Sequence, residues 1–188
     1  MKKLVGIFTL VLFVVLAANA QELKIDTSKS ELNWTGKKVT GEHHGTIQLK
    51  EGSVTLKKDK VITGKFVIDM NTIKDLDLPA GEWNDKLVGH LKSDDFFGVQ
   101  TYPEATLVLT GSTPFTNGKA TVDGKLTIKG ITNPVQFEVT KLDNQYTAQI
   151  VVDRSLYNVR YGSGKFFENL GDKTIYDNFT MDVKLVTE

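Results

Sequence analysis

Apolar and polar residues alternate along most of the chain after Gln21. The clearest stretch, residues 122–128, reads Val-Asp-Gly-Lys-Leu-Thr-Ile, with the apolar or small residues in one phase and the polar ones in the other. Because successive side chains of a strand point to opposite faces, this pattern predicts strands with one buried and one solvated face. Eight such runs are predicted, around residues 32–34, 47–49, 62–70, 105–109, 122–128, 135–139, 146–152 and 175–185. Val54 and Leu56 extend the second run beyond Gly52.

Turn-forming residues separate these runs. They stand at 51–52, 116–118, 130–134 and 143–144, where Gly, Asn, Asp and Pro tolerate tight or left-handed backbone. Antiparallel strands joined by short turns form a meander. Eight strands with one apolar face close economically into a barrel, which also removes exposed sheet edges. We therefore predict an all-β fold, an eight-stranded antiparallel barrel; a two-sheet sandwich is the alternative.

One stretch departs from the period of two. From Glu82 to Phe97 the apolar residues Trp83, Leu87 and Leu91 recur every four positions, which is typical of a helix. Pro79-Ala80-Gly81 precedes this stretch and Ser93-Asp94-Asp95 ends it, so a short helical insertion is predicted near residues 82–95. Such a helix could cover the mouth of the barrel or plug its base.

The first twenty residues have the features of a signal peptide. Two lysines are followed by an apolar run from Leu4 to Ala17, and Ala18-Asn19-Ala20 supplies a small-x-small cleavage pattern before Gln21. The run is shorter than the roughly 20 residues that span a bilayer. We therefore expect cleavage before Gln21, export to the periplasm, and a mature domain of residues 21–188 with no integral membrane segment.

Composition narrows the function further. The mature 168 residues suffice for one domain with its own core, and the chain has no cysteine, so no disulfide supports it. Without the leader, 21 basic residues face 23 acidic ones. A slightly acidic balance argues against nucleic acid as a partner, since nucleic-acid binding favours a basic surface.

The three histidines do not indicate a metal site. His43 and His44 are neighbours, so in a strand their side chains point to opposite faces, and His90 lies far along the chain with no cysteine nearby. A zinc site needs three or four converging ligands. The sequence therefore predicts neither a bound metal nor a cofactor.

Motifs of catalysis are equally weak. Gly162-Ser163-Gly164-Lys165 resembles a phosphate-binding loop, but Val159 stands where the first glycine is required and Phe166 where a hydroxyl residue is required. No Gly-x-Ser-x-Gly elbow occurs, and thiol chemistry is impossible without cysteine. We read the glycine-rich segment as a turn, and predict a binding protein in preference to an enzyme.

Apolar residues remain as the candidates for function. An eight-stranded barrel is just wide enough to be filled by side chains or to hold one small ligand, and periodicity does not decide between the two. If the barrel is hollow, its wall consists of inward-phase residues, and the candidates are Phe66, Ile68, Leu107, Leu109, Leu126, Phe137, Ile150, Phe179 and Met181.

Several blocks of the sequence resemble one known family, the YceI-like, polyisoprenoid-binding proteins of bacteria. These blocks are the segments 30–34, 64–70, 89–97, 102–109, 124–135 and 153–157, which occur in the family's order and span nearly all of the mature chain. The resemblance implies an extended lipocalin-like barrel, usually periplasmic, with an apolar cavity for a long isoprenoid chain. The chain departs from the family at Lys37 and Lys38, where many members carry a histidine.

Three functions follow from this reading. The first is carriage of an isoprenoid lipid or quinone, with the chain in the barrel and a polar head at the mouth near Lys38, His44 or Arg154; Lys37, Arg160 and Lys165 are further cations that could meet it. The second is a structural or stress-response protein with a filled barrel and a protein partner. The third is a hydrolase or isomerase acting on an apolar substrate in the cavity.

Overall fold

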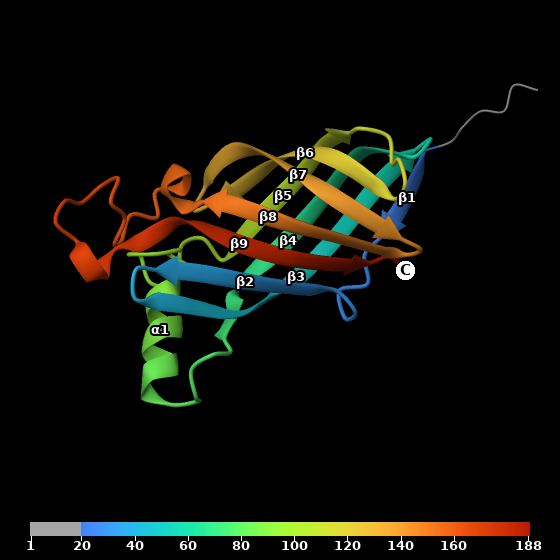
Figure 1. Cartoon of the computed structure of the whole chain (residues 1–188). Coiled ribbons are helices and arrows are strands. Elements are labelled where there is room, and N and C mark those ends of the chain that lie inside the picture. Colours follow the sequence, from blue (N-terminus) through green and yellow to red (C-terminus); the bar gives the residue numbers. More distant parts are fainter. Residues whose placement is uncertain (1–19) are drawn as a thin grey trace, which may run out of the picture.

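A computed structural model describes residues 20–188, and these fold into a closed eight-stranded antiparallel β-barrel with one additional strand and one short α-helix (Figure 1). The predicted barrel is confirmed. The predicted leader lies outside the described residues except for Ala20. The strands are β1 (Gln21–Lys24), β2 (Glu31–Lys38), β3 (Gly41–Lys57), β4 (Lys60–Asp75), β5 (Glu104–Ser112), β6 (Lys119–Ile128), β7 (Ile131–Leu142), β8 (Gln145–Asp153) and β9 (Ile175–Val186).

The barrel is an up-and-down meander. Each strand from β2 to β9 pairs with its neighbour in sequence, and β9 closes the barrel by pairing with β2. The 17-residue strand β3 is long enough to have two partners on one edge. Its first half pairs with β2 as far as Ile47, and its second half pairs with β1 from Ser53. Strand β1, which carries no clear alternation, is the extra strand.

The close approach of β3 to β4 requires a glycine. A Cβ atom built on Gly45 would lie 1.8 Å from the backbone oxygen of Lys74 and 2.8 Å from the indole of Trp34. The indole Nε1 also donates a hydrogen bond to that same oxygen, at 3.2 Å. Gly45 therefore lets Trp34 and the end of β4 meet.

The predicted inward phase holds in almost every run. Val122 is fully buried, and nearly all other inward apolar residues belong to the core or pack against it, while Val135 lines the interior of the barrel. Ile62 is the exception, because it is 45% exposed whereas Val61 is 4% exposed. The β3–β4 pairing shifts register between Thr55 and Leu56, opposite this point. Because of this shift, the first residues of β4 point to the opposite faces from those that the regular alternation predicts.

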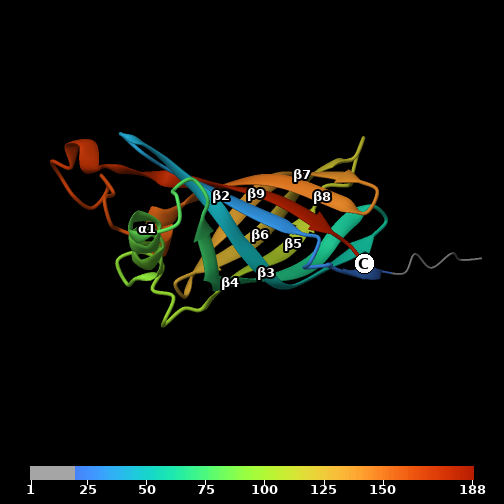
Figure 2. The ribbon, with the colours of Figure 1, turned by 90° about the horizontal axis from the view of Figure 1, so that it is seen from below.

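The helix α1 (Glu82–Lys92) ends three residues earlier than predicted. The Ser93 N–H still bonds to the oxygens of Gly89 and His90, after which the chain turns away. Trp83 was expected on the apolar face, but it is 73% exposed. The helix stands at one end of the barrel, and the C-terminus lies at the other (Figures 1 and 2).

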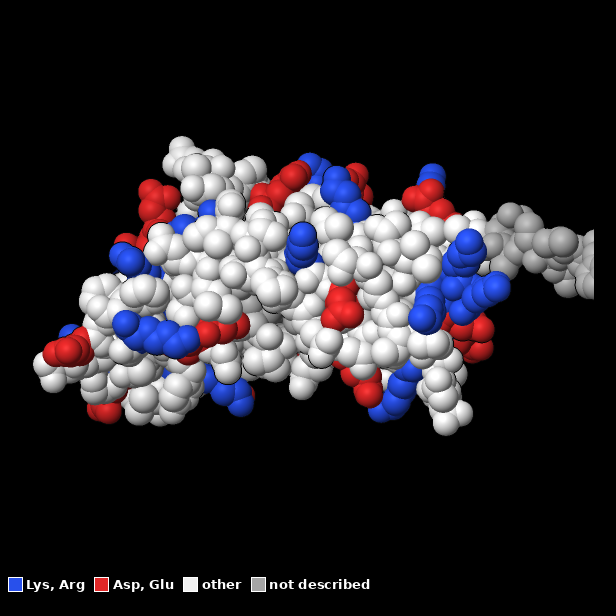
Figure 3. Space-filling view, turned by 90° about the horizontal axis from the view of Figure 1, so that it is seen from above, with Lys and Arg blue, Asp and Glu red and all other residues white. Residues whose placement is uncertain are grey.

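Short 3-10 helices flank the loop between β8 and β9, namely η1 (Arg154–Tyr157) and η2 (Gly171–Lys173). This loop lies at the same end as α1 (Figure 2). The outer wall carries scattered charges of both signs (Figure 3). Within residues 20–188, no helix reaches the length and hydropathy needed to span a membrane.

Candidate ligand cavity

The interior of the barrel contains two apolar cavities. The inner one, of about 130 Å³, lies on the side of β1 and the C-terminus. Its wall is apolar apart from Thr147 and the hydroxyl of Tyr146. Inward side chains such as Leu107 and Phe137 are only half-buried, although they line this cavity. Side chains of a filled barrel would bury each other fully, so the half-buried inner wall indicates unfilled space.

The outer cavity, of about 210 Å³, lies at the end of the barrel where α1 stands. Leu87, His90 and Leu91 of the helix form part of its wall, so the helix covers the mouth of the barrel and does not plug its base. Phe96 and Phe97, which follow the helix, complete the cover. The ring of His90 meets the ring of Tyr161 edge-on, with centroids 4.4 Å apart, which joins α1 to the β8–β9 loop.

Four side chains line both cavities and form a waist between them. They come from four strands around the barrel, β4, β6, β8 and β9, and they are Ile68, Leu126, Val152 and Met181. All four are apolar. The waist is therefore a constriction of the same chemistry as the cavities, and an apolar chain could pass it by displacing methyl and methylene groups only.

The structure places every predicted cavity residue in a cavity wall. The inner cavity has Phe66, Leu107, Leu109, Phe137 and Ile150, the outer cavity has Phe179, and the waist has Ile68, Leu126 and Met181.

The predicted headgroup residues are distributed differently. Lys38 and Arg154 line the outer cavity, as does Lys37, whose Nζ lies 3.3 Å from Glu42. His44 does not line it: strand alternation turns its side chain outward, and His43 lines the cavity in its place.

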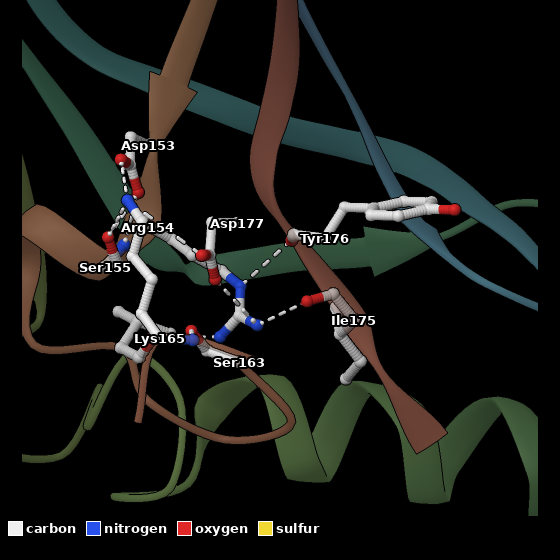
Figure 4. A network of polar contacts seen from close by, with 9 residues as sticks. Asp153, Arg154, Ser155, Ser163, Lys165, Ile175, Tyr176 and Asp177 are labelled. Carbon is white, nitrogen blue, oxygen red and sulfur yellow. Dashed lines mark hydrogen bonds and ion pairs between the residues drawn. The ribbon is translucent and has the colours of Figure 1, made fainter. Parts of the chain in front are cut away.

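Arg154 is held by the backbone of its surroundings (Figure 4). Its guanidinium donates hydrogen bonds to the oxygens of Val159 (2.8 Å), Ile175 (3.0 Å) and Tyr176 (3.2 Å). Nη2 lies 3.6 Å from Oδ1 of Asp177, and the Arg154 side chain is 3% exposed. Burial lowers the pKa of Arg154, and the nearby carboxylates oppose this. Most of its donors are therefore already used in joining the end of β8 to β9.

The predicted glycine-rich turn, residues 162–165, contacts the end of β8 next to Arg154. Lys165 Nζ lies 2.6 Å from Oδ2 of Asp153 and 2.9 Å from Oγ of Ser155 (Figure 4). Burial alone would raise the pKa of Asp153, but the bonds from Lys165 and Ser155 lower it. Lys165 is thus engaged with Asp153 and is absent from the cavity wall, as is Arg160.

A cluster of polar groups at the edge of the mouth was not predicted. Nδ1 of His43 lies 2.9 Å from Oδ2 of Asp77, and Asp75 is the third member. The two aspartates lie more than 30 residues from His43, and no spacing in the sequence links them to it. Their proximity depends on the β3–β4 pairing, in which Gly45 faces Asp75.

A comparison with protein families now places the chain. A family model described as a YceI-like domain matches residues 23–187, from β1 to the residue after β9. The chain belongs to the YceI-like family.

Relatives of this YceI-like chain occur in bacteria. A UPF0312 protein of Pseudomonas putida (strain W619) is 33% identical over 99 residues, which are 52% of this chain and 48% of that protein. A UPF0312 protein of Shewanella denitrificans is 34% identical over 85 residues, 45% of this chain and 42% of that protein. The matched segments thus span about half the length of these relatives.

Solved structures share the fold of this YceI-like chain. BcnA of Burkholderia cenocepacia has a TM-score of 0.67 at 24% identity, over 87% of this chain and 99% of BcnA. A polyisoprenoid-binding domain from Saccharophagus degradans has a TM-score of 0.58 at 20% identity, over 88% of this chain and 97% of that one. At these identities the likeness concerns the fold.

Proposed function

We propose that the protein binds the chain of an isoprenoid lipid or quinone inside its barrel and carries it through the periplasm. The observation that carries this proposal is the pair of apolar cavities that meet at the waist. Membership of the YceI-like family and the fold shared with a polyisoprenoid-binding domain support it. We propose a binding protein, not an enzyme.

The driving force is the transfer of methyl and methylene groups out of water. Each buried methylene contributes about 0.8 kcal/mol, so a chain of a few isoprene units binds without polar contacts. An apolar cavity of about 150 Å³ stays dry and holds benzene. By that measure the two cavities, of about 130 and 210 Å³, accept about two or three five-carbon units as they stand. A longer chain widens the barrel or extends through the mouth.

We place the polar head of the ligand at the mouth. Lys38 is exposed there and has no ion-pair partner among residues 20–188, so its charge is available to a phosphate or to a quinone oxygen. Arg154 contributes the positive field of a buried guanidinium, although its hydrogen bonds go to the backbone.

Mass spectrometry of an organic extract of the purified protein tests the proposal. We expect an apolar lipid to co-purify, and Lys38→Ala to reduce the retention of ligands with an anionic head only. In the lipid-free protein, Phe137→Ala should cost less than the roughly 3–5 kcal/mol typical of a filled core, because the ring borders empty space. A full core-type loss together with a lipid-free extract would leave the structural alternative with a protein partner.

The periplasmic location rests on the leader. Strand β1 begins at Gln21, so cleavage before this residue would remove no part of the barrel. N-terminal sequencing of the protein from a periplasmic extract should begin at Gln21. Recovery of intact Met1 in the membrane pellet would contradict the proposed export.

A further inference from the structure

Three potential metal ligands meet at the edge of the mouth. His43 is near the start of β3, Asp75 ends β4, and Asp77 lies in the loop that leads to α1. One ligand atom of each residue lies within 4.8 Å of the other two. We refer to these residues as the His43–Asp75–Asp77 cluster.

Asp75 is the unusual member because it is buried, with 6% of its surface exposed. Its Oδ2 accepts hydrogen bonds from the N–H of Leu78 (2.9 Å) and from Nδ2 of Asn84 (3.0 Å). Its Oδ1 is also buried and has no hydrogen-bond partner among residues 20–188. A buried acceptor without a donor is costly, and native proteins rarely leave one unexplained.

Asp77 has partners that fix its orientation. The N–H of His44 donates to Oδ1 at 2.8 Å, and His43 lies at Oδ2. The two carboxyl groups interact with each other, so two acidic side chains share one partly dry site. Both a proton and a metal ion could relieve this crowding of negative charge, but only an ion would be coordinated by the imidazole of His43 together with both carboxyl groups.

We propose that the His43–Asp75–Asp77 cluster binds a divalent transition-metal ion, with Zn²⁺ as the best fit. One imidazole nitrogen and two carboxylate oxygens form a mixed set that suits Zn²⁺, and three protein ligands leave a fourth position open. Ligands about 2.1 Å from a tetrahedral ion lie about 3.4 Å apart. An ion in the cluster would therefore part Nδ1 of His43 and Oδ2 of Asp77, now 2.9 Å apart, by about 0.5 Å, and would hold the three ligand atoms, now within 4.8 Å of one another, at about 3.4 Å.

The ion would link the parts of the mouth. His43 belongs to the wall of the outer cavity, and Asp75 is bonded to Asn84 of α1. An ion in the cluster therefore connects β3, the end of β4 and the start of α1. This proposal concerns the ion alone and does not depend on what the barrel binds.

Isothermal titration of Zn²⁺ into the metal-free protein tests the proposal. We expect one equivalent to bind, with a rise in Tm of about 5–10 °C at a free Zn²⁺ concentration 100 times the Kd. His43→Gln and Asp75→Asn should abolish both effects. The control Asp143→Asn, in the β7–β8 turn at the other end of the barrel, should retain them.

A second measurement keeps the test valid if Asp75→Asn does not fold. Co²⁺ bound to the wild-type protein should give the intense visible absorption of a four-coordinate ion, and His43→Gln should remove this absorption. The His43→Gln variant should fold, since His43 is only half-buried and lies outside the core. Absence of Zn²⁺ binding, or binding that survives His43→Gln and Asp75→Asn, would overturn the proposal. The first result would mean that a proton is shared by the two carboxyl groups in place of an ion.

Discussion

The ring of Phe97 meets the ring of Phe179 edge-on, with their centroids 6.4 Å apart. Phe97 belongs to the segment that follows α1, and Phe179 lies on β9, across the mouth of the barrel. Both rings line the outer cavity. The pair therefore forms a direct contact between the cover of the mouth and the barrel wall.

Phe97→Ala should open the outer cavity to solvent. We expect faster loss of a bound apolar fluorophore, with a smaller effect on the free energy of unfolding than a buried core residue would have, because Phe97 is only half-buried. Stopped-flow displacement measures the loss. Phe167→Ala is the matched control, since Phe167 is 50% exposed and absent from both cavity walls. Equal release rates for the two variants would show that Phe97 does not retain the ligand.

Leu126→Asp should destabilise the protein far more than Lys125→Asp. Leu126 lies in the waist, where an unpaired carboxylate is costly to bury, whereas the neighbouring Lys125 is exposed on the outer wall. We expect a loss of more than about 3 kcal/mol for the first variant and about 0.5 kcal/mol or less for the second, by urea denaturation. Similar midpoints would contradict the register of β6.

Arg154→Met should cost about 3–5 kcal/mol. The change leaves three buried or part-buried backbone oxygens without their donor, and Asp177 keeps only Lys165, whose Nζ lies 4.0 Å from its Oδ2. Thermal and chemical denaturation measure the loss. The control is Arg160→Met, because Arg160 is exposed and its guanidinium only stacks on Phe166, at 4.7 Å. Adding Asp177→Asn to Arg154→Met should recover part of the stability, since it removes a half-buried charge that would have only the distant Lys165 as its partner.

The stability contributed by Asp77 should depend on pH. Burial favours its neutral form, but bonds from His44 and interactions with Asp75 and His43 lower the pKa from 3.8 to about 2. Because the folded pKa is depressed, the contribution is complete above pH 3.8 and is lost as the pH falls towards 2. Asp77→Asn should therefore cost about 1–2 kcal/mol at pH 6, and the gap should close near pH 2.

Denaturation in the presence of a chelator at pH 6, 4 and 2.5 measures this gap without interference from metal ions. Asp75 acts in the opposite direction, because burial raises its pKa and its ionisation costs stability as the pH rises above 3.8. The control Asp143→Asn keeps a residue that tolerates the left-handed turn and should show no such gap. A constant gap for Asp77→Asn over the whole range would mean that its charge contributes nothing.

Much of the fold followed from the period of two. In a barrel with an apolar interior, the alternation of apolar and polar residues along each strand identifies the residues that point inward. All nine predicted cavity residues therefore lie in the cavity walls. The pattern failed where local geometry broke the alternation, at Ile62 beside a register shift. The helical spacing was also misleading at Trp83. It identifies an apolar face of α1, but it does not show which turns of the helix contact the barrel.

The cavities and the polar cluster could not be predicted in the same way. Whether inward side chains fill the barrel depends on the width of the barrel and on the side-chain rotamers inside it. The alternation of apolar and polar residues gives no information about either. The His43–Asp75–Asp77 cluster depends on a pairing between strands more than 30 residues apart. Neither end of such a pairing is marked in the sequence, since isolated aspartates after a strand are common in turns.

The hydrogen bonds of Arg154 bear on how the protein responds to the redox state of its surroundings. They tie the end of β8, the loop at Val159 and the start of β9 together, which is the kind of cross-link that small extracellular domains often make with a disulfide. This chain contains no cysteine. Its mouth is therefore fastened by a junction that no thiol reagent can open, so the barrel should keep the same shape and stability in reducing and oxidising surroundings.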